Sequence, residues 1–174
     1  MNRWSGLVVV LGILVSACAG PGPVRPEIEA TTPVSNAVDL IGEVRLAGIG
    51  DGESIEVRPL ADPLVDDLVE AAIEQERQQD WAAADASLKQ ALELSPDDPT
   101  LLQWRAEMAL AMGQLDAAVQ LANTSWELGP RLGSLCRRNW ATIGLARALS
   151  DLPEAAETAR RQGDKCTPTP PVRM

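Results

Sequence analysis

The chain repeats itself at an interval of 34 residues. Three residue types mark the interval: a bulky apolar residue, a small residue and a proline, which are Trp81, Ala84 and Pro96 in one copy and Leu115, Ala118 and Pro130 in the next. A small residue lets two helices approach closely, and a proline ends a helix because it lacks an amide proton and clashes with the preceding turn. A fixed offset across all three predicts a repeated pair of antiparallel helices. Such an array presents a surface, so the pattern favours binding over catalysis.

Capping residues and prolines predict where the helices begin and end. Asp62-Pro63 and Asp98-Pro99 each place a capping acid before a proline that suits the first helical turn. Gly113 interrupts the helical pattern between Met112 and Leu115. We therefore expect four helices, which run from Pro63 to about Gln79, from Trp81 to Leu94, from Pro99 to Met112 and from Leu115 to Leu128.

The segment from about Val65 to Pro130 resembles two tetratricopeptide repeats. The residues that carry the resemblance form a second-helix pattern, which is Ala84, Leu88, Ala91, Leu92 and Pro96 in the first copy and Ala118 and Pro130 in a looser second copy. The resemblance implies an all-α fold, a short solenoid of helical hairpins, whose usual role is to bind proteins or peptides. It implies neither a particular partner nor a cellular process.

A third helical hairpin is expected after Pro130, although its matching residues do not keep the 34-residue interval. Trp140, Ile143 and Gly144 match the first-helix pattern of the same family. Asp151 and Glu154 have the spacing of a capping box, which predicts the start of the last helix. About three hairpins over residues 62–166 meet the minimum that a stable solenoid needs.

The N-terminal residues have the pattern of a targeting signal. Arg3 precedes an apolar run, and residues 15–18, Val-Ser-Ala-Cys, resemble the lipobox of bacterial lipoproteins. The resemblance implies cleavage after residue 17 and acylation of Cys18, which anchors the chain in a membrane. Ala19, in place of an aspartate, predicts the outer membrane, facing the periplasm. The alternative is ordinary secretion, with cleavage near Ala17 or Ala19.

Two segments between the anchor and the helices are predicted from composition and period. Residues 18–36 hold four prolines among Gly, Thr and Ser, which predicts a disordered tether. Residues 43–47 and 54–58 alternate polar and apolar side chains around a glycine-rich stretch, so residues 37–61 are expected to form a β-hairpin or an irregular extended segment. Residues 167–174 are expected to be a proline-rich disordered tail.

The charge balance excludes several classes of partner and chemistry. Without residues 1–17, which hold Arg3 and no acid, 14 basic and 25 acidic side chains remain, a net charge of −11. A nucleic-acid partner is therefore not expected, since it requires clustered Lys and Arg. Histidine is absent, which removes the commonest general base and metal ligand. We expect no enzyme, no cofactor and no metal site.

Acidic and basic residues are concentrated in different parts of the helical region. Residues 65–98 hold ten acids and two bases, whereas residues 131–166 hold seven bases and four acids. One interpretation is a set of solvated helix faces. The other is that the charge orients a partner, or favours head-to-tail contact between copies in a homo-oligomer.

Cys136 and Cys166 are predicted to form a disulfide. The turn of the third hairpin centres near Asp151, 15 residues from each of them. In an antiparallel helix pair, positions equidistant from the turn face each other, and an exported compartment is oxidising. A redox pair is the alternative, although redox cysteines are usually close in sequence.

The resemblance places ligands in the concave groove formed by the first helices. The positions expected to face this groove are Asp66, Val69, Ile73, Glu76 and Arg77 in the first unit and Thr100, Gln103, Glu107 and Leu110 in the second. Their mix of apolar and acidic side chains would suit an extended or helical peptide with some positive charge.

Three functions remain in order of preference. The first is a membrane-anchored adaptor or assembly factor of the bacterial envelope that binds another envelope protein or peptide. The second is a self-associating structural subunit of an envelope complex. The third is a small envelope hydrolase that would use a carboxylate pair, Asp66-Asp67 or Asp97-Asp98, although these acids lie where helix starts favour negative charge anyway.

Overall fold

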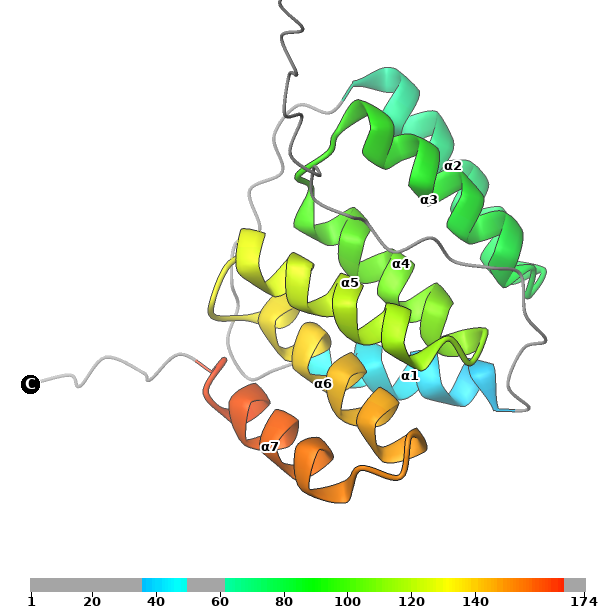
Figure 1. The fold of residues 1–174 in the computed structure, drawn as a ribbon. Coiled ribbons are helices and arrows are strands. Elements are labelled where there is room, and N and C mark those ends of the chain that lie inside the picture. The colour runs from blue at the N-terminus through cyan, green and yellow to red at the C-terminus, as the bar shows by residue number, and fades with distance from the viewer. Residues whose placement is uncertain (1–35, 50–61, 168–174) are drawn as a thin grey trace, which may run out of the picture.

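The computed structural model describes residues 36–49 and 62–167, and within these ranges the chain consists of helices joined by turns, with no strand (Figure 1). The helices are α1 (Ala37–Gly48), α2 (Pro63–Arg77), α3 (Trp81–Leu94), α4 (Pro99–Ala111), α5 (Leu115–Leu128), α6 (Ser134–Leu149) and α7 (Pro153–Asp164). The all-α prediction is confirmed. None of these helices is long and apolar enough to cross a membrane.

The predicted helix starts are confirmed by their hydrogen bonds. The Asp62 side chain accepts the amide of Leu64 at 3.0 Å, and Asp98 accepts that of Thr100 at 2.8 Å. In both cases the proline that follows occupies the first helical turn, where its missing amide proton costs nothing. Gly113 leaves the helical region with a φ of 73°, so a residue without a side chain makes the turn from α4 to α5.

The capping box predicted at Asp151 and Glu154 is wrong. Asp151 adopts a φ of 57°, and the amide of Leu152 returns to the carbonyl of Arg147 at 3.0 Å. This is the left-handed ending of α6, whose carbonyls need donors, and it places Asp151 before the cap position of α7. The cap residue of α7 is Leu152, and it makes no side-chain hydrogen bond.

The helices pair as α2–α3, α4–α5 and α6–α7, and successive pairs stack through α3 with α4 and α5 with α6 (Figure 1). Alanines occupy the closest approaches, and Ala84, Ala91, Ala106, Ala118 and Ala122 are fully buried. Leucines and Met108 fill the space between them. Small residues at helix contacts allow close packing without cavities, which explains why a core with few aromatic side chains can be dense.

The first helix corrects the prediction for residues 37–61. Residues 43–47, expected as a strand, lie in the C-terminal half of α1, and the expected second strand at 54–58 lies outside the described residues. The buried side of α1 is formed by Ala37, Leu40, Ile41, Val44 and Gly48. Their spacing is that of one helix face. The polar–apolar alternation that predicted a strand covers only five residues, which is too short to distinguish the two periods. The signal segment, the tether and the tail also lie outside the described residues.

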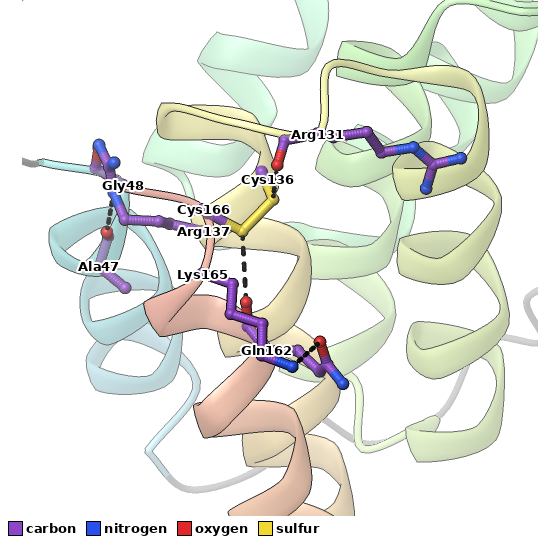
Figure 2. Close-up of a disulfide and its surroundings, with 8 residues drawn as sticks. All are labelled: Ala47, Gly48, Arg131, Cys136, Arg137, Gln162, Lys165 and Cys166. Atoms are coloured by element: carbon purple, nitrogen blue, oxygen red, sulfur yellow. Dashed lines mark hydrogen bonds between the residues drawn. A yellow bond between two sulfur atoms is a disulfide. The ribbon is translucent and has the colours of Figure 1, made fainter. Parts of the chain in front are cut away.

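The disulfide between Cys136 and Cys166 is present, with a Cα–Cα distance of 5.7 Å (Figure 2). Both cysteines are buried. The amide of Gly133 donates to the carbonyl of Cys166 at 2.7 Å, so a backbone hydrogen bond accompanies the covalent link. The bridge joins the start of α6 to the end of α7 and closes the last hairpin, which no further hairpin covers within the described part of the chain.

Replacing both cysteines, Cys136→Ser with Cys166→Ser, is expected to lower the free energy of unfolding by about 3 kcal/mol, because the open chain regains loop entropy. Urea unfolding measures this loss. Reductant should lower the unfolding midpoint of the parent chain and leave the double variant unchanged. An unchanged parent midpoint in reductant would contradict a stabilising bridge.

Two glycines of α1 are expected to respond in opposite directions to the same substitution. A Cβ at Gly42 would meet no atom within 4 Å, so Gly42→Ala should stabilise the chain by about 0.5–1 kcal/mol through helix propensity. A Cβ at Gly48 would lie 2.9 Å from Cγ of Arg138, so Gly48→Ala should destabilise by about 1–3 kcal/mol. Urea unfolding of the two variants checks this, and equal shifts would show that α1 does not pack closely on α6.

Candidate functional site

Helix α1 lies over most of the α4 residues that were expected to face an open groove. Helix α1 packs on α4 and α6 and makes no close backbone contact with α2. Gln103, Glu107 and Leu110 of α4 are fully buried, and Thr100 is half-buried. Their prediction as open groove residues is therefore wrong for the three buried ones, because the segment expected as a hairpin folds as a helix on the same face.

Three of the five first-unit residues remain exposed. On α2, Asp66, Ile73 and Arg77 are exposed, whereas Val69 and Glu76 are half-buried. The structure thus divides the nine predicted positions. Three of the five on α2 are exposed to solvent, and most of those on α4 lie in the interior.

The buried carboxylate of Glu107 lies at the centre of an ionic cluster. Its side chain has no solvent exposure. Arg45 of α1 donates to it from Nε at 3.0 Å, and Arg138 of α6 donates from Nη2 at 2.5 Å and from Nε at 2.9 Å. Gln103 adds a fourth hydrogen bond at 3.0 Å. Two cations and an amide therefore compensate a charge that would be very costly to bury alone.

Arg45 connects this cluster to α2. Its Nη1 and Nη2 donate to the two carboxylate oxygens of Glu76 at 2.5 and 2.9 Å, and the indole of Trp104 donates to Glu76 at 2.8 Å. The guanidinium also lies 6.0 Å from the centre of the Trp104 ring. One side chain from α1 thus joins α2 to α4, although the backbones of α1 and α2 do not meet.

The surroundings of Arg45 keep its guanidinium charged. Burial by itself lowers the pKa of this group, but the hydrogen bonds and negative charges of Glu76 and Glu107 outweigh the burial, so the pKa lies above its usual value. The ion pairs therefore do not depend on pH through Arg45. In this cluster Glu76 and Glu107 bind α1, which is not the external partner predicted for them.

The C-terminal end of α1 is held by the residue next to the disulfide. Arg137 donates to the carbonyl of Ala47 at 3.0 Å and to that of Gly48 at 2.7 Å (Figure 2). These carbonyls have no hydrogen-bond donor within the helix. The positive charge of Arg137 is also attracted to the partial negative charge at the C-terminal end of α1. Since Cys136 precedes Arg137, the disulfide anchors the turn of α6 that holds α1.

Arg45, Arg137 and Arg138 were not predicted as site residues. A signal for Arg45 was present, because it is the only basic residue between Asn36 and Glu76 apart from Arg58. In the sequence, the two arginines of α6 contribute only to the positive charge of residues 131–166. Nothing in their local sequence indicates that they contact residues about 90 and 31 positions away.

Between α1 and the end of α2 a pocket of about 340 Å³ remains open. Its lining is shared by α1 and the α2–α3 turn and consists of Val38, Ile41, Gly42, Arg45, Glu76, Arg77, Gln79 and Trp81. Together with the exposed side of α2, this pocket is the part of the groove that α1 does not fill. In residues 36–49 and 62–167 no cluster of acids and cysteines is arranged to hold a metal ion.

The substitution Glu107→Gln is expected to lower the free energy of unfolding by about 3 kcal/mol, because it replaces the buried carboxylate that two partly buried arginines, Arg45 and Arg138, share by a neutral amide. The matched control is Glu157→Gln on the surface of α7. Its pair with Arg160 is about half exposed, so the control should change stability by less than about 0.5 kcal/mol. Urea midpoints compare the two variants. Similar small shifts would mean that the cluster does not hold α1.

Comparison with known proteins supports the repeat assignment. Residues 67–131, from the second turn of α2 to just beyond α5, match the tetratricopeptide repeat family. No curated protein matches the chain significantly. Repeats of this family generally bind proteins or peptides, and the fold is typically a scaffold without catalytic activity. Residues 67–131 therefore form tetratricopeptide-type repeats, within an all-α array that α6 and α7 extend and α1 partly fills.

Proposed function

We propose that the chain is a lipid-anchored adaptor or assembly factor of the bacterial envelope. The observation that carries the proposal is a repeat array whose groove is open along α2 and closed along α4 and α6 by a helix of the same chain. An array with part of its groove free has a surface for a partner, and part of that surface comes from α1.

The anchor is proposed from the sequence. Residues 15–18 have the lipobox pattern, and Ala19 favours the outer membrane, with the helical array facing the periplasm. The disulfide supports an oxidising compartment, since such bonds are rare where thiols are kept reduced. Two or more acyl chains would attach the protein stably.

Self-association is the second candidate, and the divided charge of the helical region favours it. Much of the positive charge of α6 is however used inside the molecule, where Arg138 binds Glu107 and Arg137 binds the end of α1. Arg160 and Arg161 of α7 both lie beside Glu157. The basic end therefore has less free charge for a second copy than the sequence suggests, and the adaptor is preferred.

The hydrolase has the least support. Asp98 uses its side chain to cap α4, and Asp66 and Asp67 lie in the first turns of α2, where an acid stabilises the helix dipole.

The substitution Cys18→Ser is expected to remove the anchor. The parent chain should fractionate with membranes and carry the added mass of acyl chains, whereas the variant should be released and carry none. Fractionation of cells followed by intact-mass measurement checks both points. A parent chain of unmodified mass in the soluble fraction would contradict lipidation and favour ordinary secretion.

Crosslinking in cells tests the adaptor function. Formaldehyde treatment should join the anchored chain to a different envelope protein, whose size and identity are read by mass spectrometry. A series of species at multiples of the chain's own mass would instead establish self-association. Crosslinking of the Cys18→Ser variant shows whether capture of the partner depends on the anchor.

A further inference from the structure

The loop between α5 and α6, residues 129–133, holds an apolar side chain in solvent. Leu132 in this loop is 52% exposed, and Leu128, the last residue of α5, is 48% exposed. Neither leucine belongs to the hydrophobic core. Exposed leucines that lie close together, unlike scattered ones, indicate a surface that meets another molecule or a membrane.

The neighbours of Leu132 on both sides are fixed. The guanidinium of Arg131 lies 3.7 Å from the centre of the Trp126 ring, and the carbonyl oxygen of Arg131 lies 3.0 Å from Sγ of Cys136 (Figure 2). On the other side, the amide of Gly133 is bound to the end of the last hairpin by its hydrogen bond to Cys166. The exposure of Leu132 is therefore a property of the fold, since the loop around it is held in place.

The ends of α1 and α7 lie beside this loop. The disulfide brings the end of α7 to the start of α6, and Arg137 of α6 binds the carbonyl of Gly48 at the end of α1. The next residue of α1, Ile49, is 76% exposed. We call this end of the molecule the loop end, and its exposed apolar residues are Ile49, Leu128 and Leu132.

Basic residues of the last hairpin are concentrated at the loop end. Of the seven bases in residues 131–166, all except Arg147 lie in the loop, in the first half of α6, or from the second half of α7 to its cap. Two of the four acids, Asp151 and Glu154, lie at the opposite end of the hairpin. Because Arg138 is bound to Glu107, five bases face three acids at the loop end, a net charge of +2. The bases are Arg131, Arg137, Arg160, Arg161 and Lys165, and the acids are Glu127, Glu157 and Asp164.

We propose that the loop end docks on a membrane surface that carries anionic headgroups. Leu128 and Leu132 enter the headgroup region, and the basic residues around them contact lipid phosphates. The inference rests on the proposed lipid anchor, which brings the chain to a membrane, and it adds which side of the molecule faces that membrane.

A membrane suits this surface better than a protein partner does. A fixed, protruding leucine can enter the headgroup region without a matching pocket, and the long basic side chains can reach phosphates while their stems stay among apolar groups. The first hairpin has the opposite charge, with ten acids and two bases in residues 65–98. An anionic surface therefore repels the first hairpin and attracts the last, which orients the molecule with the loop end toward the lipid. The exposed side of α2 then stays free for a protein partner.

Two single-cysteine variants, Leu132→Cys and Leu152→Cys, test the docking. Leu152 is the matched control, because it is an exposed leucine, at 44%, in the turn at the opposite end of the last hairpin. Each variant is labelled with a fluorophore. The label reaches only the introduced thiol, since Cys136 and Cys166 are bridged and the proposed acylation blocks Cys18.

The labelled chains are reconstituted in vesicles of phosphatidylethanolamine and phosphatidylglycerol, with and without a lipid that carries a bromine quencher in its acyl chain. The label at position 132 should lose at least about half of its emission to the quencher, and the label at position 152 less than about a tenth. Urea midpoints close to that of the parent show that both variants fold. Equal quenching at the two positions, or none at position 132, overturns the proposal.

Two changes of the vesicles test the charge and the occupant. With phosphatidylcholine in place of phosphatidylglycerol, quenching at position 132 should fall by at least about twofold, because the basic residues lose their anionic partners. Unchanged quenching overturns the part assigned to these residues. Quenching should not depend on the number of chains per vesicle. If position 132 is protected from the quencher only on crowded vesicles, the loop end contacts a second copy, and the proposal is wrong.

The intact mass of the same preparation separates this inference from the anchor. If the chain carries acyl groups and position 132 is not quenched, the anchor stands and the loop end does not dock. If the chain carries none, the anchor fails. The two labels are then compared in the Cys18→Ser chain added to the same vesicles, and equal quenching there overturns the docking as well.

Discussion

The carboxylate of Glu107 is fully buried, and its compensation comes from two helices that are distant in sequence. Arg45 reaches it from α1, and Arg138 reaches it from α6. Breaking a buried ion pair leaves an uncompensated charge in a medium of low dielectric constant, and that is costly. The cluster therefore couples the positions of α1, α4 and α6, and because Arg45 also binds Glu76, it includes the end of α2. The path of the groove depends on these four side chains.

Because α1 covers α4 and α6, less of the groove is left for a partner than in an uncovered array. A short array of three hairpins offers little groove, and α1 takes up the part over α4 and α6. Much of the positive charge of α6 is bound inside the molecule, since Arg138 binds Glu107 and Arg137 binds the end of α1.

The disulfide contributes to the same arrangement. It secures the start of α6, and the next residue, Arg137, holds the end of α1 (Figure 2). Arg138 follows and binds Glu107, the carboxylate that also binds Arg45 of α1. A terminal hairpin has one face without a neighbour, so it loses packing energy that inner hairpins have. The covalent link offsets that loss and keeps the two arginines in position.

Local sequence determined the repeated hairpins. Asp-Pro pairs begin α2 and α4, small residues allow the helices to pack, and two cysteines equidistant from a turn meet across it. Each of these signals acts within one hairpin, so it can be read from spacing alone. Only the tertiary structure decided which part of the groove is open, because that depends on contacts such as Arg45 with Glu107, 62 residues apart. Residues 43–47 alternate like a strand over a span too short to settle the period, and packing against α4 and α6 selected the helix, since Leu40, Ile41 and Val44 can then be buried together.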